Sequence, residues 1–517
     1  MGGLLADSMG EVPDGFEVPQ AKVAKPRPSA ALVATRDGER GAEILFCHRV
    51  STMPSFPDFW AFPGGGVKRF DTEAAERLPH LSGNEEGAAL AALMREMAEE
   101  VAWAPSGRGL VTIDEITRSA ILDDGRIWVE AADAGEIPSN PSGFNIISVR
   151  TTPPLAPIRF ENRFFHLHDA KAPNPILPSE GSEFDQCKWM RPQDVLDSWE
   201  RCDMRIPPPQ ITLLRDIVDA LNRNDGDMEA ASMELAASPP TGEHRIEYAP
   251  TVELVPLPTS TLPPSTHTNC YLLGEPGGDV VVVDPAAKDD EAMSYLERRI
   301  RIHEELGGRV VATIFTHRHP DHIGDLGMIS KIYQAPIWAT TETHAVIPDC
   351  DSDRILVEGD EFTLGKRTWK VLETPGHCPG HICLSSDVGV VSGDLAVVVG
   401  TILVPSGEGD MDDYLSSLKR VRDLDPPLLF PGHGPLSPTP RRLLDRYLKH
   451  RQARHARVLE AVLGGTSNLH EIANLAYADT PDAHPILKVD QTISHLKSHQ
   501  KAGDIRSGEG GWHPSTR

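Results

Sequence analysis

The sequence predicts a layered α/β protein built from more than one domain. Two apolar, β-branched runs, residues 280–283 and 310–315, have the length and composition of buried strands. Both runs end in polar residues, as in open α/β sheets, which bind ligands at the carboxyl ends of their strands. At 517 residues the chain is also too long for one hydrophobic core and suggests two to four domains.

Composition limits the classes of protein to which the chain can belong. Hydrophobic residues make up 39% and charged residues 24%, which is ordinary for a soluble globular protein. The formal net charge of −26 argues against general nonspecific binding to nucleic acid, so any such contact needs a local basic patch. Seven scattered cysteines suggest a reducing compartment. With no apolar run of about 18 residues and no signal or transit peptide, we expect a cytoplasmic protein without a membrane partner.

The turn at residues 316–322 is rich in side chains that bind metals. His317, His319, Asp321 and His322 all fall within it, directly after the second strand-like run. Imidazole and carboxylate ligands in this combination suit zinc, iron or manganese. A polar turn with solvated histidines is the alternative for this segment taken alone. The turn therefore predicts a metal site.

Three later segments supply further ligands. His377, Asp394 and His433 each follow an apolar, strand-like run. Glycines flank all three, and a glycine lets the backbone approach a ligand closely. Each segment thus places one side chain of ligand type at the end of a strand.

Together with Asp284, these segments resemble, in order, the five motifs of the metallo-β-lactamase fold family. The resemblance implies a four-layer αββα sandwich that binds two metal ions. It assigns one ion to His317, His319 and His377 and the second to Asp321, His322 and His433, with Asp394 bridging the two. Asp284 and His381 have no ligand role in this pattern and are expected to support the ligands.

The implied chemistry is hydrolysis. Two divalent ions about 3.5–4 Å apart lower the pKa of a shared water toward 7 and polarise a carbonyl or phosphoryl oxygen. The ions are expected to be zinc, or else manganese or iron, because sites of this kind accept all three. Asp321 and Asp394 are the candidate catalytic residues, since either can also position the attacking water. Cys378 and Cys383 lie near His377 and are expected to be small buried residues.

The N-terminal half contains a second group of acidic residues. A Gly-rich turn at residues 62–67 precedes a helical segment that contains Glu96, Glu99 and Glu100. On a helix these carboxylates cluster on one face, and Arg95 is spaced to pair with Glu99. Carboxylate clusters suit Mg²⁺ or Mn²⁺ and, through the ion, a diphosphate substrate. The arrangement resembles the Nudix hydrolase signature, which implies an α/β/α domain and a nucleoside or coenzyme A diphosphate as substrate.

Departures from that signature bear on activity. Residues 69–83 form an insertion, as in long-insert Nudix relatives that act on coenzyme A compounds. Gly87 stands where the signature has a Glu, with Glu85 and Glu86 nearby, and Ala102 stands where it has a Gly. An amphipathic helix with a solvated charged face is the alternative for this segment.

The chain becomes basic and helical after His433. Its basic residues there are Arg441, Arg442, Arg446, Lys449, Arg451, Arg454 and Arg457. Two short helical patterns and a wing-like end follow, so we predict a winged helix, a variant of the helix-turn-helix. With residues 268–272, this half resembles the β-lactamase-like protein 2 group, which includes endoribonucleases that act on single-stranded RNA. The alternatives are a solvated basic face, or a winged helix that caps the catalytic domain or mediates dimerisation.

The predicted organisation and function follow from these segments. We predict a flexible arm at 1–27, a Nudix-like domain at 28–221, an acidic and Pro-rich linker at 222–248, a metallo-β-lactamase domain at 249–440, a winged helix at 441–507 and a tail at 508–517. The first functional hypothesis is cleavage of RNA phosphodiesters, with the basic segment contacting phosphates. The alternative is hydrolysis of a thioester, such as an acyl-CoA, or of a lactone. A third class is a non-catalytic protein that binds nucleic acid.

Overall fold

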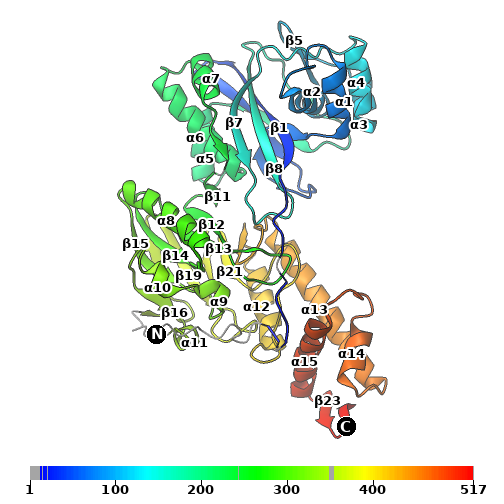
Figure 1. Cartoon of the computed structure of the whole chain (residues 1–517), viewed down its shortest axis with the longest axis vertical. Helices are drawn as coiled ribbons and strands as arrows, with labels where there is room; N and C mark the ends of the chain where they lie inside the picture. Colours follow the sequence, from blue (N-terminus) through cyan, green and yellow to red (C-terminus); the bar gives the residue numbers. More distant parts are fainter. Residues whose placement is uncertain (1–11, 14, 20, 243, 348–353, 516–517) are drawn as a thin grey trace. The chain divides into compact units, whose positions relative to one another are not determined.

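The computed structural model describes residues 12–13, 15–19, 21–242, 244–347 and 354–515, and Figure 1 shows its helices and strands. Ala24–Pro250 form one compact unit, the N-terminal unit. Thr251–Arg517, with the described residues before Ala24, form the second, the C-terminal unit. Residues 1–11, 14 and 20 of the predicted arm lie outside the described part of the chain. None of the described helices is long and apolar enough to cross a membrane.

The N-terminal unit is built on one mixed sheet. Its described strands run in the order β10-β7-β8-β1-β2-β3, with β4 beside β1 and β9 beside β2. The central strands β1 and β8 are parallel, and β1 and β2 are antiparallel neighbours. The strands are β1 (Arg27–Gly38), β2 (Gly41–Arg49), β3 (Trp60–Ala61), β4 (Gly64–Gly66), β7 (Asn145–Thr151), β8 (Phe160–His168), β9 (Phe184–Met190) and β10 (Thr241–Gly242).

Helices cover both faces of this sheet, because its central strand is buried on both sides. Ala30, Leu32 and Ala34 of β1 belong to one hydrophobic core, whereas Ala31 and Val33 belong to the other. This alternation with a period of two is the pattern of a strand with two covered faces. The first core is covered by α1 (Arg69–Arg77), α2 (Gly87–Val101), α3 (Glu115–Asp123) and α4 (Arg126–Asp133), and the second by α5 (Pro192–Glu200), α6 (Pro208–Arg223) and α7 (Met228–Ala237). The layers are therefore α/β/α, as predicted.

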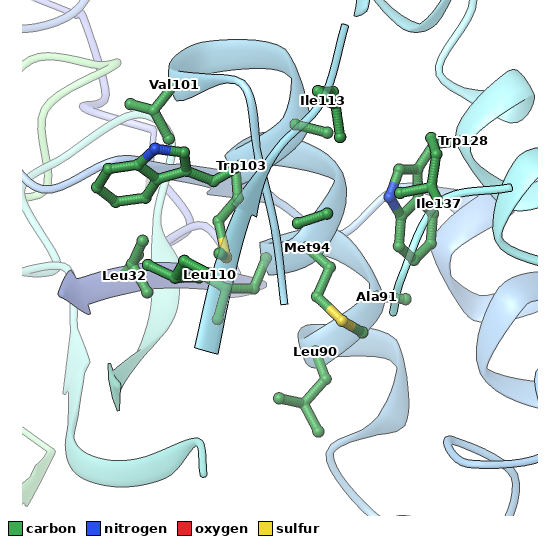
Figure 2. Close-up of a cluster of buried hydrophobic side chains, with 14 of the residues drawn as sticks. Leu32, Leu90, Ala91, Met94, Val101, Trp103, Leu110, Ile113, Trp128 and Ile137 are labelled. Carbon is green, nitrogen blue, oxygen red and sulfur yellow. The ribbon is translucent and has the colours of Figure 1, made fainter. Parts of the chain in front are cut away.

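Helix α2 is largely buried, which fixes its acidic residues in place. Leu90, Ala91 and Met94 of α2 belong to the same hydrophobic core as Trp103 and Trp128 (Figure 2). Trp128 comes from α4, and Trp103 begins a hairpin made of β5 (Trp103–Ser106) and β6 (Gly109–Thr112). Both indole rings are fully buried and supply a large apolar area to this core.

The stretch at 222–248, predicted to be a linker, is folded instead. Asp227 caps α7 by accepting hydrogen bonds from the backbone of Glu229 and Ala230. Met228, Ala231, Ser232 and Leu235 of α7 are buried, and the strands β10 and β11 (Ile246–Ala249) follow. The acidic and Pro-rich composition suggested a linker, but four buried positions on α7 are enough to anchor it.

The C-terminal unit contains two sheets that pack face to face. Tyr271 of β13 contacts the ring of Phe430 in β22 and donates a hydrogen bond of 2.7 Å to the carbonyl of Pro431. In this unit the first sheet contains β12 (Val252–Pro258), β13 (His267–Leu273), β14 (Asp279–Val283), β15 (Arg309–Ile314), β16 (Ile337–Ala339) and β17 (Arg354–Ile355), in that order. The second contains β18 (Glu361–Leu364), β19 (Arg367–Glu373), β20 (Ile382–Ser386), β21 (Gly389–Gly393) and β22 (Leu429–Pro431).

Helices cover the outer faces of both sheets. Helix α8 (Asp290–Glu305) packs on the first sheet, and α12 (Met411–Asp423) packs on the second. The short helices α9 (Pro320–Ile323), α10 (Leu326–Ile329) and α11 (Thr341–His344) follow β15 and β16. The result is the αββα order of layers that the sequence predicted.

The C-terminal end of the chain adds a helical layer. It consists of α13 (Pro440–Leu463), α14 (Leu469–Ala476), α15 (Pro485–Ala502) and a hairpin of β23 (Ile505–Gly508) and β24 (Gly511–Pro514), coloured orange to red in Figure 1. Helix α13 belongs to two cores: Leu444 and Tyr447 pack with α12, whereas Val458 and Val462 pack with α14 and α15. The predicted boundary at residue 441 therefore falls inside a helix that both parts share. Part of the predicted tail at 508–517 is strand β24.

Candidate metal centre

The structure brings the seven predicted metal ligands together at the ends of strands. The turn after β15 and the first turn of α9 carry four of them. The others follow β19, β21 and β22. All seven side chains are buried: His317, His319, Asp321, His322, His377, Asp394 and His433.

Three imidazoles form the first ligand group. His319 Nδ1 lies 3.1 Å from His317 Nε2 and 3.0 Å from His377 Nε2. Nitrogens around one tetrahedral zinc ion are roughly 3.3 Å apart, given Zn–N bonds of about 2.0–2.1 Å. Burial, with neighbouring imidazoles, lowers the pKa of His317 well below its ordinary value and that of His377 to about 4. These two rings are therefore neutral, the form that binds a metal.

The second ligand group combines two imidazoles and a carboxylate. His322 Nε2 lies 3.2 Å from His433 Nε2, which lies 3.4 Å from Asp321 Oδ2. Both carboxylate oxygens of Asp321 are buried without a hydrogen-bond partner. Although burial opposes it, Asp394 and Asp321 raise the pKa of His433 to about 9. The two carboxylates thus create a negative site that a cation fits.

Asp394 lies between the two groups. Its Oδ1 is 3.5 Å from the Nε2 atoms of both His322 and His433, and its Oδ2 is 3.8 Å from His377 Nε2. Oδ1 is also buried without a hydrogen-bond partner. One oxygen facing each group is the arrangement of a bridging ligand. Gly432 is needed beside it, because a Cβ there would lie 2.7 Å from Asp394 Oδ1.

Further residues orient the ligands from outside, as partners of metal-bound histidines generally do. Asp284 accepts hydrogen bonds from the backbone and hydroxyl of Thr316 at 2.8 and 2.7 Å, and its Oδ2 lies 2.8 Å from His322 Nδ1. His433 Nδ1 donates to the carbonyl of His267 at 2.9 Å. Asp284 therefore has the supporting role that the sequence suggested.

Glu408 is a supporting residue that sequence reasoning missed. Its Oε1 lies 2.6 Å from His319 Nε2, and its Oε2 accepts from Arg318. Glu408 is in an irregular loop 89 residues after His319 and outside every recognised motif, so the sequence carried no signal for it.

Cys378 also lies close to the first group. A ligand atom of this residue is within 4.8 Å of those of His317, His319 and His377. Burial raises the pKa of the Cys378 thiol well above its ordinary value, so the thiol is protonated rather than a thiolate ligand. Cys378 and Cys383 are both fully buried, as expected of small core residues.

A pocket opens directly beside the ligands. The turn at residues 261–265 forms one wall of it. The remaining lining residues are Val397, Val399, Thr401, Ile402, Leu403 and the ligands His377, Asp394 and His433. Among the described residues no Lys or Arg lines this pocket. Most of the lining residues other than the ligands have apolar side chains.

The acidic residues of α2 surround an arginine. Arg95 donates to Glu96 at 2.8 Å and Glu99 at 3.0 Å, and also to both oxygens of Asp71, a partner that the sequence did not reveal. Glu100 Oε2 accepts from the backbone of Gly64 at 2.8 Å, and its Oε1 is buried without a partner.

The charge state of these carboxylates depends on their burial. Burial and the charge of Glu96 raise the pKa of Glu99 to about 7, against the opposing charge of Arg95. Among the described residues, the groups whose ligand atoms converge within 4.8 Å all belong to the C-terminal unit. Glu96, Glu99 and Glu100 are therefore near one another but do not converge on one point in this structure.

Two of the seven basic residues near the C-terminus are buried, so they do not belong to the basic segment that the sequence suggested for contacts with phosphates. Arg451 donates to Gln491 at 2.9 Å and lies over the ring of Tyr414. Arg454 donates to Asp479 at 2.8 Å and stacks on Tyr477. Neither guanidinium is available to a phosphate, because both side chains are buried within the protein.

Comparison with known families agrees with the fold of the C-terminal unit. Residues 264–433 match the family model of the metallo-beta-lactamase superfamily. The C-terminal unit therefore contains a domain of the metallo-beta-lactamase superfamily.

Individual relatives are similar to parts of the chain. A beta-lactamase-like protein 2 homolog of Drosophila melanogaster is 27% identical over 252 residues, which are 46% of this chain and 84% of the relative. An atrochrysone carboxyl ACP thioesterase of Aspergillus fumigatus is 26% identical over 200 residues, 38% of this chain and 59% of the relative. The crystal structure of a NUDIX hydrolase from Alicyclobacillus acidocaldarius is 27% identical, with a TM-score of 0.34 over 38% of this chain and 92% of that one.

Proposed function

We propose that the C-terminal unit is a dinuclear metal-dependent hydrolase that cleaves acyl thioesters. The main support for a dinuclear metal centre is the position of Asp394, whose two oxygens face two separate ligand groups. The buried carboxylate oxygens without hydrogen-bond partners support it further, because a buried negative group needs a cation or a donor. The donor set of imidazoles and carboxylates fits zinc, manganese or iron.

The pocket favours an acyl substrate over the RNA phosphodiester that the sequence suggested first. Its walls beside the ligands are apolar side chains such as Val397, Ile402 and Leu403. A polyanion depends on Lys and Arg contacts for most of its affinity, whereas an acyl chain gains from apolar walls. The thioesterase among the relatives supports the same choice.

The buried polar residues of α15 are a second reason to favour a thioester over RNA as the substrate. In a helix-turn-helix fold the second helix of the motif presents side chains to the nucleic acid. We propose that α13 to β24 form the winged helix, with α15 in that position. However, Asp490, Gln491 and Ser494 of α15 are buried against residues 404–406 of the metallo-beta-lactamase domain. These side chains already bind the metallo-beta-lactamase domain, and this supports a winged helix that caps that domain.

Each part of the site has a separate role in the proposed hydrolysis. Metal ions held by the two ligand groups would activate water and polarise the acyl carbonyl. The carboxylate of Asp321, whose oxygens are otherwise unpartnered, is placed to orient the attacking water and receive its proton. The apolar walls of the pocket exclude competing water from the acyl chain.

The proposal is tested with the full chain loaded with Zn²⁺ or Mn²⁺. Acyl-CoA thioesters of increasing chain length are offered, and release of free thiol is measured beside cleavage of labelled single-stranded RNA. We expect thiol release that Asp321→Ala abolishes, because the water loses its carboxylate. Cleaved RNA beside intact thioesters would reverse the choice of substrate.

We propose a second activity, hydrolysis of a nucleoside or coenzyme A diphosphate, for the N-terminal unit. Glu100 supports it, because one of its buried oxygens binds the backbone of Gly64 and the other has no partner. With Mg²⁺ or Mn²⁺ as cofactor, Glu96, Glu99 and Glu100 would hold the ion. The test is release of phosphate-containing products from these diphosphates, with loss expected in Glu99→Gln and Glu100→Gln. Unchanged release in both variants would contradict the assignment.

A further inference from the structure

The loop at residues 401–409, here called the support loop, links the metal centre to the C-terminal helical layer. It lies between β21 and α12 and contains no helix or strand. Two of its groups accept hydrogen bonds from metal-site histidines. The carbonyl of Leu403 accepts from His377 Nδ1 at 2.8 Å, and the Glu408 carboxylate lies 2.6 Å from His319 Nε2.

The support loop is held from its other side by α15. Gln491 Nε2 donates to the carbonyl of Val404 at 2.7 Å, and its Oε1 accepts from the backbone of the same residue at 3.3 Å. The hydroxyl of Ser494 donates to the same carbonyl at 2.7 Å. Asp490 accepts from the hydroxyl of Ser406 at 2.6 Å and from its backbone at 3.2 Å.

Helix α13 completes this attachment. Arg451, which is 2% exposed, donates to the carbonyl of Ile402 and, at 3.2 Å, to the hydroxyl of Thr401. The same guanidinium donates to Gln491 at 2.9 Å, so α13 and α15 act on the loop through connected hydrogen bonds. A segment without regular structure depends on such side-chain contacts for its conformation.

The second ligand group has no such attachment among the contacts that the structure describes. His322 Nδ1 meets Asp284, at the end of β14, and His433 Nδ1 meets the carbonyl of His267, in β13. His267 begins β13 and Asp284 directly follows β14, so both supports come from strands of the first sheet or their ends. The two ligand groups are therefore oriented by different parts of the fold.

We propose that the C-terminal helical layer is a positioning element for the first metal site, which it controls through the support loop. Gln491, Asp490 and Arg451 are its positioning residues, and they set the affinity of the His317, His319 and His377 group for its ion. The second group keeps its affinity without them. This inference rests on the proposed metal centre, but it does not depend on which substrate the centre hydrolyses.

The test compares metal binding by full-length variants. Zn²⁺ affinity is measured by competition with a chromophoric chelator, and we expect two equivalents of different affinity in the wild type. In Gln491→Ala and Asp490→Ala we expect one equivalent to weaken about 10- to 100-fold, the range for loss of an outer partner of a metal ligand. The other equivalent should be unchanged. Lys488→Ala is the matched control on the same helix, because Lys488 binds Asn474 instead of the loop.

Two further variants separate positioning from general damage. Glu408→Gln changes the support loop without touching either helix and should weaken the same equivalent. Asp490→Asn keeps an oxygen that can accept from Ser406 and should recover most of the affinity lost in Asp490→Ala. Cobalt substitution identifies the equivalent, because the absorption of the three-histidine site should be the one that is lost.

Several outcomes would overturn the inference. Wild-type affinity for both equivalents in Gln491→Ala, Asp490→Ala and Glu408→Gln would mean that the helical layer does not act on the site. Equal weakening of both equivalents would mean that the layer stabilises the whole unit without selecting one site. A wild-type protein that binds no metal would overturn the proposed function as well, so the two failures are distinct.

Discussion

His381 Nε2 accepts a hydrogen bond of 3.1 Å from the backbone nitrogen of Asp394, the carboxylate that faces both ligand groups. The opposite ring nitrogen, Nδ1, lies 2.9 Å from the hydroxyl of Thr374. Burial lowers the pKa of His381 to about 3, so the ring is neutral and can accept at Nε2. His381 therefore holds the segment that presents Asp394, although it is not itself a ligand.

Replacing His381 should reduce turnover without removing a metal ligand. His381→Phe keeps a ring in the buried site but loses both hydrogen bonds, which frees the segment at Asp394. We expect kcat to fall about 10- to 100-fold, as for other partners that orient a metal site. Steady-state kinetics on a thioester, with metal content measured in parallel, checks the result. An unchanged kcat would mean that Asp394 keeps its place without His381.

Removing the metal should destabilise the C-terminal unit alone. The buried carboxylates of Asp321 and Asp394 repel one another, and a bound cation would attract both. An ion at about 1,000 times its Kd stabilises a fold by about 4 kcal/mol, and each kcal/mol shifts Tm by roughly 2–4 °C in a domain of this size. We expect a chelator to lower one calorimetric transition by roughly 10 °C. The transition of the N-terminal unit should stay in place, and Asp321→Ala should make the other one less sensitive to the chelator.

The N-terminal unit should lose stability in acid because of His166. Burial lowers the pKa of this residue to about 3, below the value of about 6.5 in an unfolded chain. The unfolded chain therefore binds a proton that the folded chain does not, so the stabilisation is complete above about pH 6.5 and is lost as the pH falls toward 3. In His166→Gln we expect a shallower fall of the urea midpoint between pH 6.5 and 4, followed by tryptophan fluorescence. His80→Gln, an exposed histidine, should keep the wild-type slope.

Reversing exposed charges on α13 should not affect hydrolysis of a thioester. Arg442 and Lys449 are exposed, unlike Arg451 and Arg454. We expect Arg442→Glu with Lys449→Glu to leave kcat/KM and the melting temperature close to wild type. A protein that binds RNA through this helix would behave differently. If each of the two residues binds one phosphate, its replacement would reduce the slope of log affinity against log salt concentration by about one.

The proposed metal ligands could be located from the sequence because each one ends a short apolar strand or lies within the turn at 316–322. Residues such as Glu408 and Gln491 could not, since their contacts join positions far apart in the chain and follow no periodic pattern. The burial of Arg451 could not be predicted from the sequence for a related reason. A basic residue in a helical pattern looks the same whether its face meets solvent or another layer.

The fold of the N-terminal half shows the same division. The apolar run from Ala30 to Ala34 and the Gly turn are local features of the sequence, and they mark β1 and the approach to α2. Asp71 was not foreseen as the partner of Arg95, because it lies in the insertion, 24 residues earlier in the chain. Helix α7 was hidden by its acidic surroundings, although Asp227 supplies an ordinary N-terminal cap.

Helix α13 has one half in the core beside α12 and the other half in the core of α14, α15 and the terminal hairpin. The two halves cannot fray independently without breaking a continuous run of backbone hydrogen bonds. A protein shortened after Leu463 would lose the partners of Val458 and Val462 and also the side chains of α15 that bind the support loop. A deletion intended to remove only an accessory domain would therefore also change the proposed metal centre. We therefore expect hydrogen exchange to show a single cooperative opening that includes the αββα sandwich and the elements from α13 to β24.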